Sequence, residues 1–68
     1  MERITELTTL KIGDKLYSPK LNKNFIVVDY SYNEIFKQMV ANLSALEKNE
    51  RGFTISLKDL IELEYELY

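Results

Sequence analysis

The chain has 68 residues and contains neither cysteine nor histidine. Without cysteine it can form no disulfide and offers no thiolate to a metal. Without histidine it also lacks the commonest general base and metal ligand, so none of its serines can belong to a conventional catalytic triad. Its stability must come from a small hydrophobic core, with a partner or a second copy as a further source.

Glycine is scarce as well, since Gly13 and Gly52 are the only two in the chain. Two isolated glycines cannot build a phosphate-binding loop, and the acidic residues show no EF-hand spacing. Glu62, Glu64 and Glu66 alternate, and in a strand they would share one face about 7 Å apart. Hard cations bind such oxygens, but a solvated strand face is the simpler interpretation. We therefore predict no enzyme activity, no cofactor and no metal site.

No apolar run is long enough to cross a bilayer, and residues 1–10 lack the basic and apolar regions of a signal peptide. These absences lead us to expect a soluble cytoplasmic protein without a membrane partner. Residues 1–68 should form one small domain, in which residues 1–10 are an N-terminal arm or a first strand.

Turn and strand signals are clear in the first half of the chain. Gly13 and Asp14 predict a turn before a short strand that Pro19 ends, because proline has no amide hydrogen to donate. Residues 25–32, FIVVDYSY, are aromatic and β-branched and predict the strongest strand. Its two-residue period places Ile26, Val28 and Tyr30 on one face, with an apolar opposite face. We therefore expect a central strand covered on both sides.

Residues 33–48 fit two structures. Their apolar residues recur at helical spacing, Ser31 and Glu34 form a capping-box pattern, and the composition favours a helix. The same residues also alternate as a strand with two unequal faces would. Gly52 then serves as a helix C-cap or as the last residue of a hairpin loop of three to five residues.

The C-terminal part of the sequence predicts a strand, a turn and a second strand. Phe53 and Ile55 should point inward from a strand over residues 53–56. Ser56 and Asp59 are typical of a capped helical turn. After this turn, residues 62–68 alternate glutamates with apolar residues, which predicts a half-buried edge strand.

This order resembles the small SH3-like barrels carried by phages and prophages. The resemblance rests on the segments LKIGDKLYSP, FIVVDYS and GFTISLKDL, and on residues Gly13, Asp14, Phe53, Ile55, Asp59, Leu60 and Tyr65. It implies a mainly β fold: a five-stranded barrel with one short helical turn before the last strand, which pairs beside the first. The alternative is a small α+β fold with a helix at about residues 32–48 packed on a sheet.

Charge suggests one candidate function. The net charge is −2, which argues against nucleic-acid binding overall. A local basic strip nevertheless remains, formed by Lys11, Lys15, Lys20 and Lys23, and the nucleic-acid alternative adds Lys37 to it. With Tyr17, Tyr30 and Tyr32 as stacking groups, this strip suggests a nucleic-acid-binding or ribosome-binding barrel as an alternative function.

The aromatic content favours a different function. Tyrosine is enriched at contact surfaces because it combines an apolar body with a polar tip. We predict a protein-interaction module, a phage or mobile-element accessory protein that binds and modulates or inhibits a host protein, for example one in bacterial defence. The candidate partner-binding residues are Tyr17, Tyr30, Tyr32, Phe36, Glu62, Glu64, Glu66 and Tyr68. The acidic tail would engage a basic surface. A homodimer paired through the C-terminal edge strand is the third hypothesis.

Overall fold

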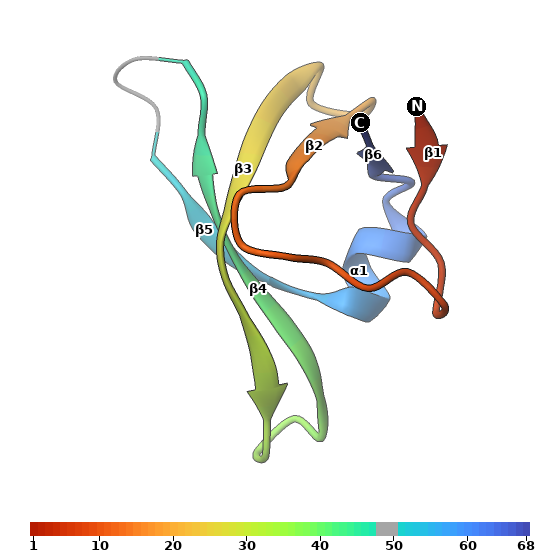
Figure 1. Cartoon of the computed structure of the whole chain (residues 1–68), viewed down its shortest axis with the longest axis vertical. Helices are drawn as coiled ribbons and strands as arrows, with labels where there is room; N and C mark the ends of the chain where they lie inside the picture. The colour runs from red at the N-terminus through yellow and green to blue at the C-terminus, as the bar shows by residue number, and fades with distance from the viewer. Residues whose placement is uncertain (48–50) are drawn as a thin grey trace.

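One antiparallel sheet and one short helix make up the computed structural model, which describes residues 1–47 and 51–68. Within these residues the sheet has 6 strands. The strands are β1 (Glu2–Arg3), β2 (Lys15–Ser18), β3 (Lys23–Asn33), β4 (Gln38–Ala45), β5 (Phe53–Ser56) and β6 (Glu66–Leu67), and the helix is α1 (Leu57–Glu62) (Figure 1). The mainly β class predicted from the sequence is confirmed.

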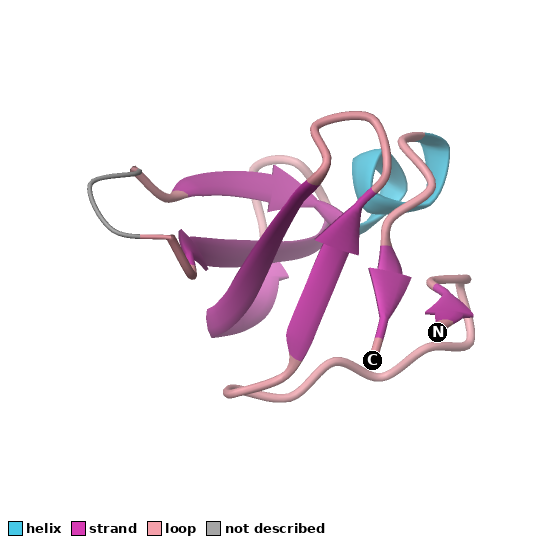
Figure 2. Ribbon diagram, turned by 90° about the horizontal axis from the view of Figure 1, so that it is seen from above, coloured by secondary structure: helices cyan, strands magenta, loops and turns pink. Residues whose placement is uncertain are grey.

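The strand order is β1-β6-β2-β3-β4-β5, so β1 and β5 are the two edges. In the described part of the chain these edges do not pair, and the sheet is not closed into a barrel. The last strand lies between β1 and β2 and pairs with both. The two termini are therefore neighbours in both views (Figures 1 and 2).

The turn before β2 forms as the sequence predicts. Gly13 has a φ of 97°, which is open to glycine and strained for other residues. The Asp14 carboxylate accepts a 2.8 Å hydrogen bond from the backbone N–H of Lys11. β2 then runs to Ser18, directly before Pro19, and Asn22 adopts a left-handed φ of 53° in the turn to β3.

Strand β3 is central, as predicted, but its faces differ from those predicted. The register with β4 shifts between Val27 and Asp29, so Val28 is an extra, bulged residue. The bulge reverses the alternation, and Tyr30 therefore shares the inner face with Val27. The expectation that Ile26, Val28 and Tyr30 share one covered face is wrong, since Val28 is 49% exposed on the open side of the sheet.

The alternative fold with a helix at about residues 32–48 is wrong, because residues 32–45 form the end of β3, a turn and β4. The strand interpretation of this segment is confirmed for residues 38–45. The Asn33 side chain decides the turn locally. Its Oδ1 accepts hydrogen bonds of 2.9 Å from the backbone N–H groups of both Ile35 and Phe36. Lys37 then takes a left-handed φ of 54°, which ends any helical turn. The Ser31–Glu34 pattern therefore does not cap a helix.

Past β4, the chain continues toward β5. The predicted hairpin loop ending at Gly52 includes residues 48–50, which lie outside the described residues. Phe53 and Ile55 then point inward, opposite Leu43 and Ala41, as predicted.

Helix α1 begins where the sequence predicts it. The Ser56 Oγ accepts a 3.1 Å hydrogen bond from the backbone N–H of Asp59. The continuous edge strand predicted for the tail is wrong, because Glu62 still belongs to α1 and Glu64 has a left-handed φ of 61°. Only Glu66–Leu67 forms a strand, and this strand is interior. Among the described residues, no helix has the length and apolar character needed to span a membrane.

The core lies on the inner face of the sheet. Its sheet residues are Leu16, Phe25, Val27, Ala41, Leu43 and Ile55, and it is completed by Ile4, Leu10, Leu60 and Tyr65. The rings of Phe25 and Phe53 are 5.1 Å apart and nearly perpendicular at 78°, a favourable edge-to-face contact. The N-terminal segment and α1 thus cover the inner face near β6, while the distal end of the β3–β4 hairpin extends beyond them (Figure 1).

Candidate interaction surface

The distal end of the β3–β4 hairpin carries exposed apolar side chains. Ile35 is 87% exposed, Phe36 67% and Tyr32 56%. Ile35 and Phe36 lie in the turn that Asn33 closes, and Tyr32 lies at the end of β3. Large apolar side chains that are exposed together at one end of a small protein are typical of a contact surface. We call Tyr32, Ile35 and Phe36 the hairpin end.

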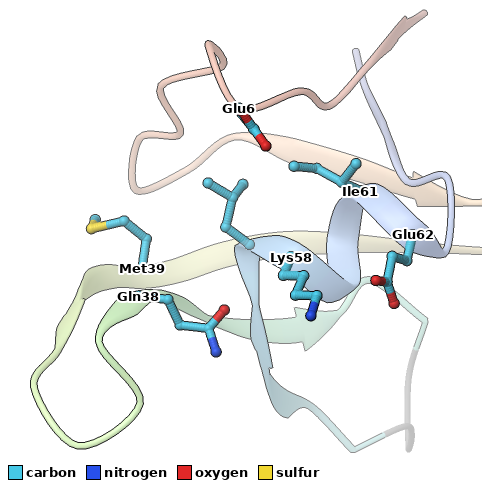
Figure 3. Close-up of a pocket in the computed structure, with 7 residues that line it drawn as sticks. Glu6, Gln38, Met39, Lys58, Ile61 and Glu62 are labelled. Carbon is cyan, nitrogen blue, oxygen red and sulfur yellow. The ribbon is translucent and has the colours of Figure 1, made fainter.

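A groove adjoins the hairpin end on the inner side of the sheet. It has a volume of about 440 Å³ and an apolar floor formed by Met39, Leu57 and Ile61. Met39 comes from β4 and is the register partner of Tyr32, so the groove continues directly into the hairpin end. Figure 3 shows that the helix supplies the opposite wall.

The rim of this groove is charged. Glu6 approaches from the N-terminal segment, and Lys58 and Glu62 come from α1 (Figure 3). The groove thus combines an apolar floor with carboxylates and an ammonium around it, as protein-binding sites commonly do.

A second hollow lies on the other side of β4. It has a volume of about 220 Å³ and is lined by Phe36, Val40, Ile55 and Asp59, among others. Ala41 is buried on the inner face, so its neighbour Val40 lies on the outer face of β4 and Met39 on the inner face. Phe36 lines this hollow beside Val40 and therefore reaches the outer face. The hairpin end therefore offers apolar contacts on both faces of the sheet.

Of the aromatic residues predicted for partner binding, the structure brings together Tyr32 and Phe36 at the hairpin end. Tyr30 is half-buried and packs against the core, and burial raises the pKa of its hydroxyl. Tyr17 and Tyr68 lie at the other end of the hairpin, beside Asn24 at the start of β3. Their hydroxyls donate to the Oδ1 atoms of Asn22 and Asn24 at 2.7 and 2.8 Å, which fixes both rings on the sheet.

The predicted glutamates do not share one face. Glu62 lies on the rim of the groove, whereas the Glu64 carboxylate accepts from the Arg3 guanidinium at 3.3 Å. Glu66 is half-buried in β6 opposite Tyr17. The physical reason is that the helix, the left-handed residue and the short strand each turn the chain, so the alternating pattern never becomes one strand.

The lysines of the nucleic-acid alternative are spread over several elements. Lys11 precedes the first turn, Lys15 begins β2, Lys20 lies in the β2–β3 turn, Lys23 begins β3 and Lys37 is at the far turn of the hairpin. Their proposed stacking partners also separate, because Tyr17 lies on the outer face of the sheet and Tyr32 on the inner face. The structure therefore does not gather them into one platform.

Several residues of this surface were not predicted from the sequence. They are Ile35, Met39, Leu57 and Ile61. The available signal was Asn33, a residue that favours turns, directly before an apolar pair. In the described residues no group of three or more acidic side chains is placed to hold a metal ion.

Comparison with protein-family models, curated proteins and solved structures gives no match for this chain. The interpretation of this surface consequently depends on its geometry and chemistry alone.

Proposed function

We propose that the chain is a small non-enzymatic interaction module that binds a protein partner through the hairpin end and the adjoining groove. The observation that carries the proposal is the exposure of Ile35 and Phe36 at the tip of a hairpin whose turn is fixed by Asn33. Ordering such apolar residues before binding reduces the entropy that association costs.

The chemistry of the surface favours a protein partner. Aromatic residues at the centre of a contact contribute most of the affinity, and Tyr32 and Phe36 are suited to that role. The groove beside them can accept an apolar side chain of the partner. Its rim carries Glu6 and Glu62 beside a single lysine, which favours a partner with basic residues around its apolar anchor.

We further propose that the module belongs to a phage or mobile element and modulates or inhibits a host protein in the cytoplasm. The support is the resemblance of the GFTISLKDL segment and the Gly13–Asp14 turn to small SH3-like barrels. The arrangement in which the short helix α1 leads β6 back beside β1 supports a relation to that architecture. In this proposal the open sheet is a variant of the SH3-like barrel.

Photocrosslinking tests the proposal directly. A photoreactive amino acid replaces Phe36 in one variant and Ile12, which is 71% exposed in the N-terminal loop, in the control variant. After irradiation in a lysate of the natural host, we expect one protein adduct from position 36 that survives nuclease treatment and is missing from position 12. Equal adducts from both positions would refute the assigned surface, and adducts only to nucleic acid would favour the lysine alternative.

A further inference from the structure

One stretch of β3 has a free hydrogen-bonding edge. Strand β2 pairs only with Lys23–Ile26, and the next residue, Val27, exchanges backbone bonds of 2.8 Å with Gly13 and Asp14. On its other side β3 pairs with β4 as far as Asn33. Residues 29–33 therefore have β4 on one side and, within the described residues, no strand on the other. Figure 1 shows this part of β3 at the margin of the molecule.

The ladder with β4 determines which backbone groups the free edge presents. The N–H of Leu46 donates to the carbonyl of Asn24 at 3.1 Å, so Leu46 faces β3. Every second residue back along β4 must then face β3 as well, because the bonding direction alternates in an antiparallel pair. Val40 is one of these residues and is the register partner of Ser31, so the backbone groups of Ser31 face β4. The N–H and C=O groups of Tyr30 and Tyr32 consequently point to the free edge.

The free segment has definite limits. The bulge at Val28 disrupts the strand on one side, and the turn begins at Glu34 on the other. Ser31 is the midpoint of the residues between these limits. A partner strand that uses the whole segment in an antiparallel arrangement is therefore centred on Ser31.

We propose that the partner is a second copy of this chain, paired through β3 about a two-fold axis at Ser31. In this register Tyr30 faces Tyr32 of the second copy, and Tyr32 faces its Tyr30. Each of these pairs exchanges the backbone bonds that the free edge presents, and each brings two aromatic side chains together on the inner face. The two sheets become one continuous sheet.

The remaining positions of this register are also complementary. Asp29 faces Asn33 of the second copy, so its carboxylate meets an amide and not another charge. The Asn33 Oδ1 already accepts bonds from Ile35 and Phe36. Its Nδ2 group has no acceptor among the described residues and can donate to the carboxylate. Charged residues usually protect sheet edges from pairing, whereas this register pairs Asp29 favourably.

This dimer shares Tyr32 with the hairpin end, but its register leaves Ile35, Phe36 and the groove outside the contact. The groove uses β4, α1 and the N-terminal segment, which lie away from the free edge of β3. It also replaces the dimer predicted through the C-terminal strand, because β6 is interior and has no free edge. Either proposal can fail while the other holds.

A charge pair at the axis tests the dimer. Ser31 is exposed, and it would meet its own copy across the axis. We expect sedimentation equilibrium to show a concentration-dependent dimer for the natural chain. Ser31→Lys and Ser31→Glu should each raise the dissociation constant by roughly tenfold or more through like-charge repulsion. An equimolar mixture of the two variants should restore the dimer. Ser44→Lys, on the same face of β4, is the control and should leave the constant unchanged.

Crosslinking gives a second readout that does not depend on dimer affinity. The chain has no cysteine of its own, so a single Ser31→Cys substitution gives one thiol per copy. Across a non-hydrogen-bonded antiparallel pair the two Cα atoms are about 4.5 Å apart, which permits a disulfide. We expect Ser31→Cys to form a covalent dimer much faster than Ser44→Cys on mild oxidation. Equal rates for the two variants, or a natural chain that stays monomeric at millimolar concentration, would overturn the proposal.

Discussion

The Oδ1 of Asn33 accepts a hydrogen bond from the backbone N–H of Phe36 at 2.9 Å. This bond turns the chain back after β3 and places the Phe36 ring at the tip of the hairpin. One side chain thereby selects a hairpin in a segment whose composition favours a helix. The same side chain presents the apolar residues on which the proposed function depends.

Replacing Asn33 by alanine should destabilise the turn. Asn33→Ala leaves the N–H groups of Ile35 and Phe36 without their acceptor, and we expect the free energy of unfolding to fall by about 1 kcal/mol. Urea denaturation of dilute, monomeric protein measures this loss. Asn33→Asp retains an acceptor oxygen and should stay within a few tenths of a kcal/mol of the natural chain. Equal losses for both substitutions would argue against the capping role.

The Asn33→Asp variant also distinguishes the effect of Asn33 on the turn from its effect on the dimer. In the proposed register, Asn33→Asp places a second carboxylate opposite Asp29 of the other copy and removes the amide donor. We expect the dimer dissociation constant to rise while the unfolding free energy of the monomer changes little. Sedimentation equilibrium and denaturation on the same samples give both values. A dimer unaffected by Asn33→Asp would contradict the register centred on Ser31.

The two glycines should respond differently to alanine. A Cβ at Gly52 would collide with the carbonyl of Leu43 and crowd the Cα of Ser44, and both are backbone atoms that cannot move aside. A Cβ at Gly13 meets no atom within 4 Å, so only its φ of 97° opposes substitution. We expect Gly52→Ala to cost about 2 kcal/mol or more, and Gly13→Ala about 1 kcal/mol. Thermal and urea unfolding of both variants measures the two losses. A larger loss for Gly13→Ala than for Gly52→Ala would show that the close contact of Gly52 with Leu43 is unimportant.

The stability of the fold should decline at alkaline pH through Tyr65. Burial raises the pKa of its hydroxyl, and a hydrogen bond with Ser18 opposes this effect without cancelling it. Above the ordinary pKa of 10.0 the folded chain therefore holds a proton that the unfolded chain has lost. This contribution to stability is complete below that pH and is lost as the pH rises through the folded pKa.

Comparison with Tyr65→Phe isolates this group from the lysines that titrate in the same range. We expect the unfolding free energy of Tyr65→Phe to fall less steeply as the pH rises above that ordinary pKa. Urea denaturation across this range measures the slope. Parallel curves for the two proteins would exclude a role for the buried hydroxyl.

The local parts of the fold could be predicted from the sequence. The Gly13–Asp14 turn, the inward side chains of Phe53 and Ile55, and the Ser56 cap each depend on dihedral preferences or on hydrogen bonds within a few residues. Such signals are present in any short window of the chain, and the structure confirms them.

The predictions that were wrong concern features that depend on contacts between segments far apart in the sequence. Residues 38–45 satisfy both the helical and the strand period, and pairing with β3 and β5 decides in favour of the strand. No glycine or other local signal in the sequence marks the bulge at Val28. The sequence therefore could not show that the strand changes faces there and that Tyr30 points inward. Tyr32 and Phe36 could be proposed as contact residues because aromatic side chains are common at such surfaces. The groove beside Met39 and Ile61 could not be predicted, because it exists only once α1 packs against the sheet.

The most direct test of the proposed function is a comparison of affinity capture by matched surface variants. The natural chain, a double variant Ile35→Ser with Phe36→Ser, and the control Ile12→Ser would each be immobilised in a nuclease-treated lysate of the natural host. Bound proteins would then be quantified by mass spectrometry. We expect one stoichiometric protein that the natural chain and the control retain equally and that the double variant loses, although all three remain folded. Equal recovery by all three proteins would contradict a contact surface at the hairpin end.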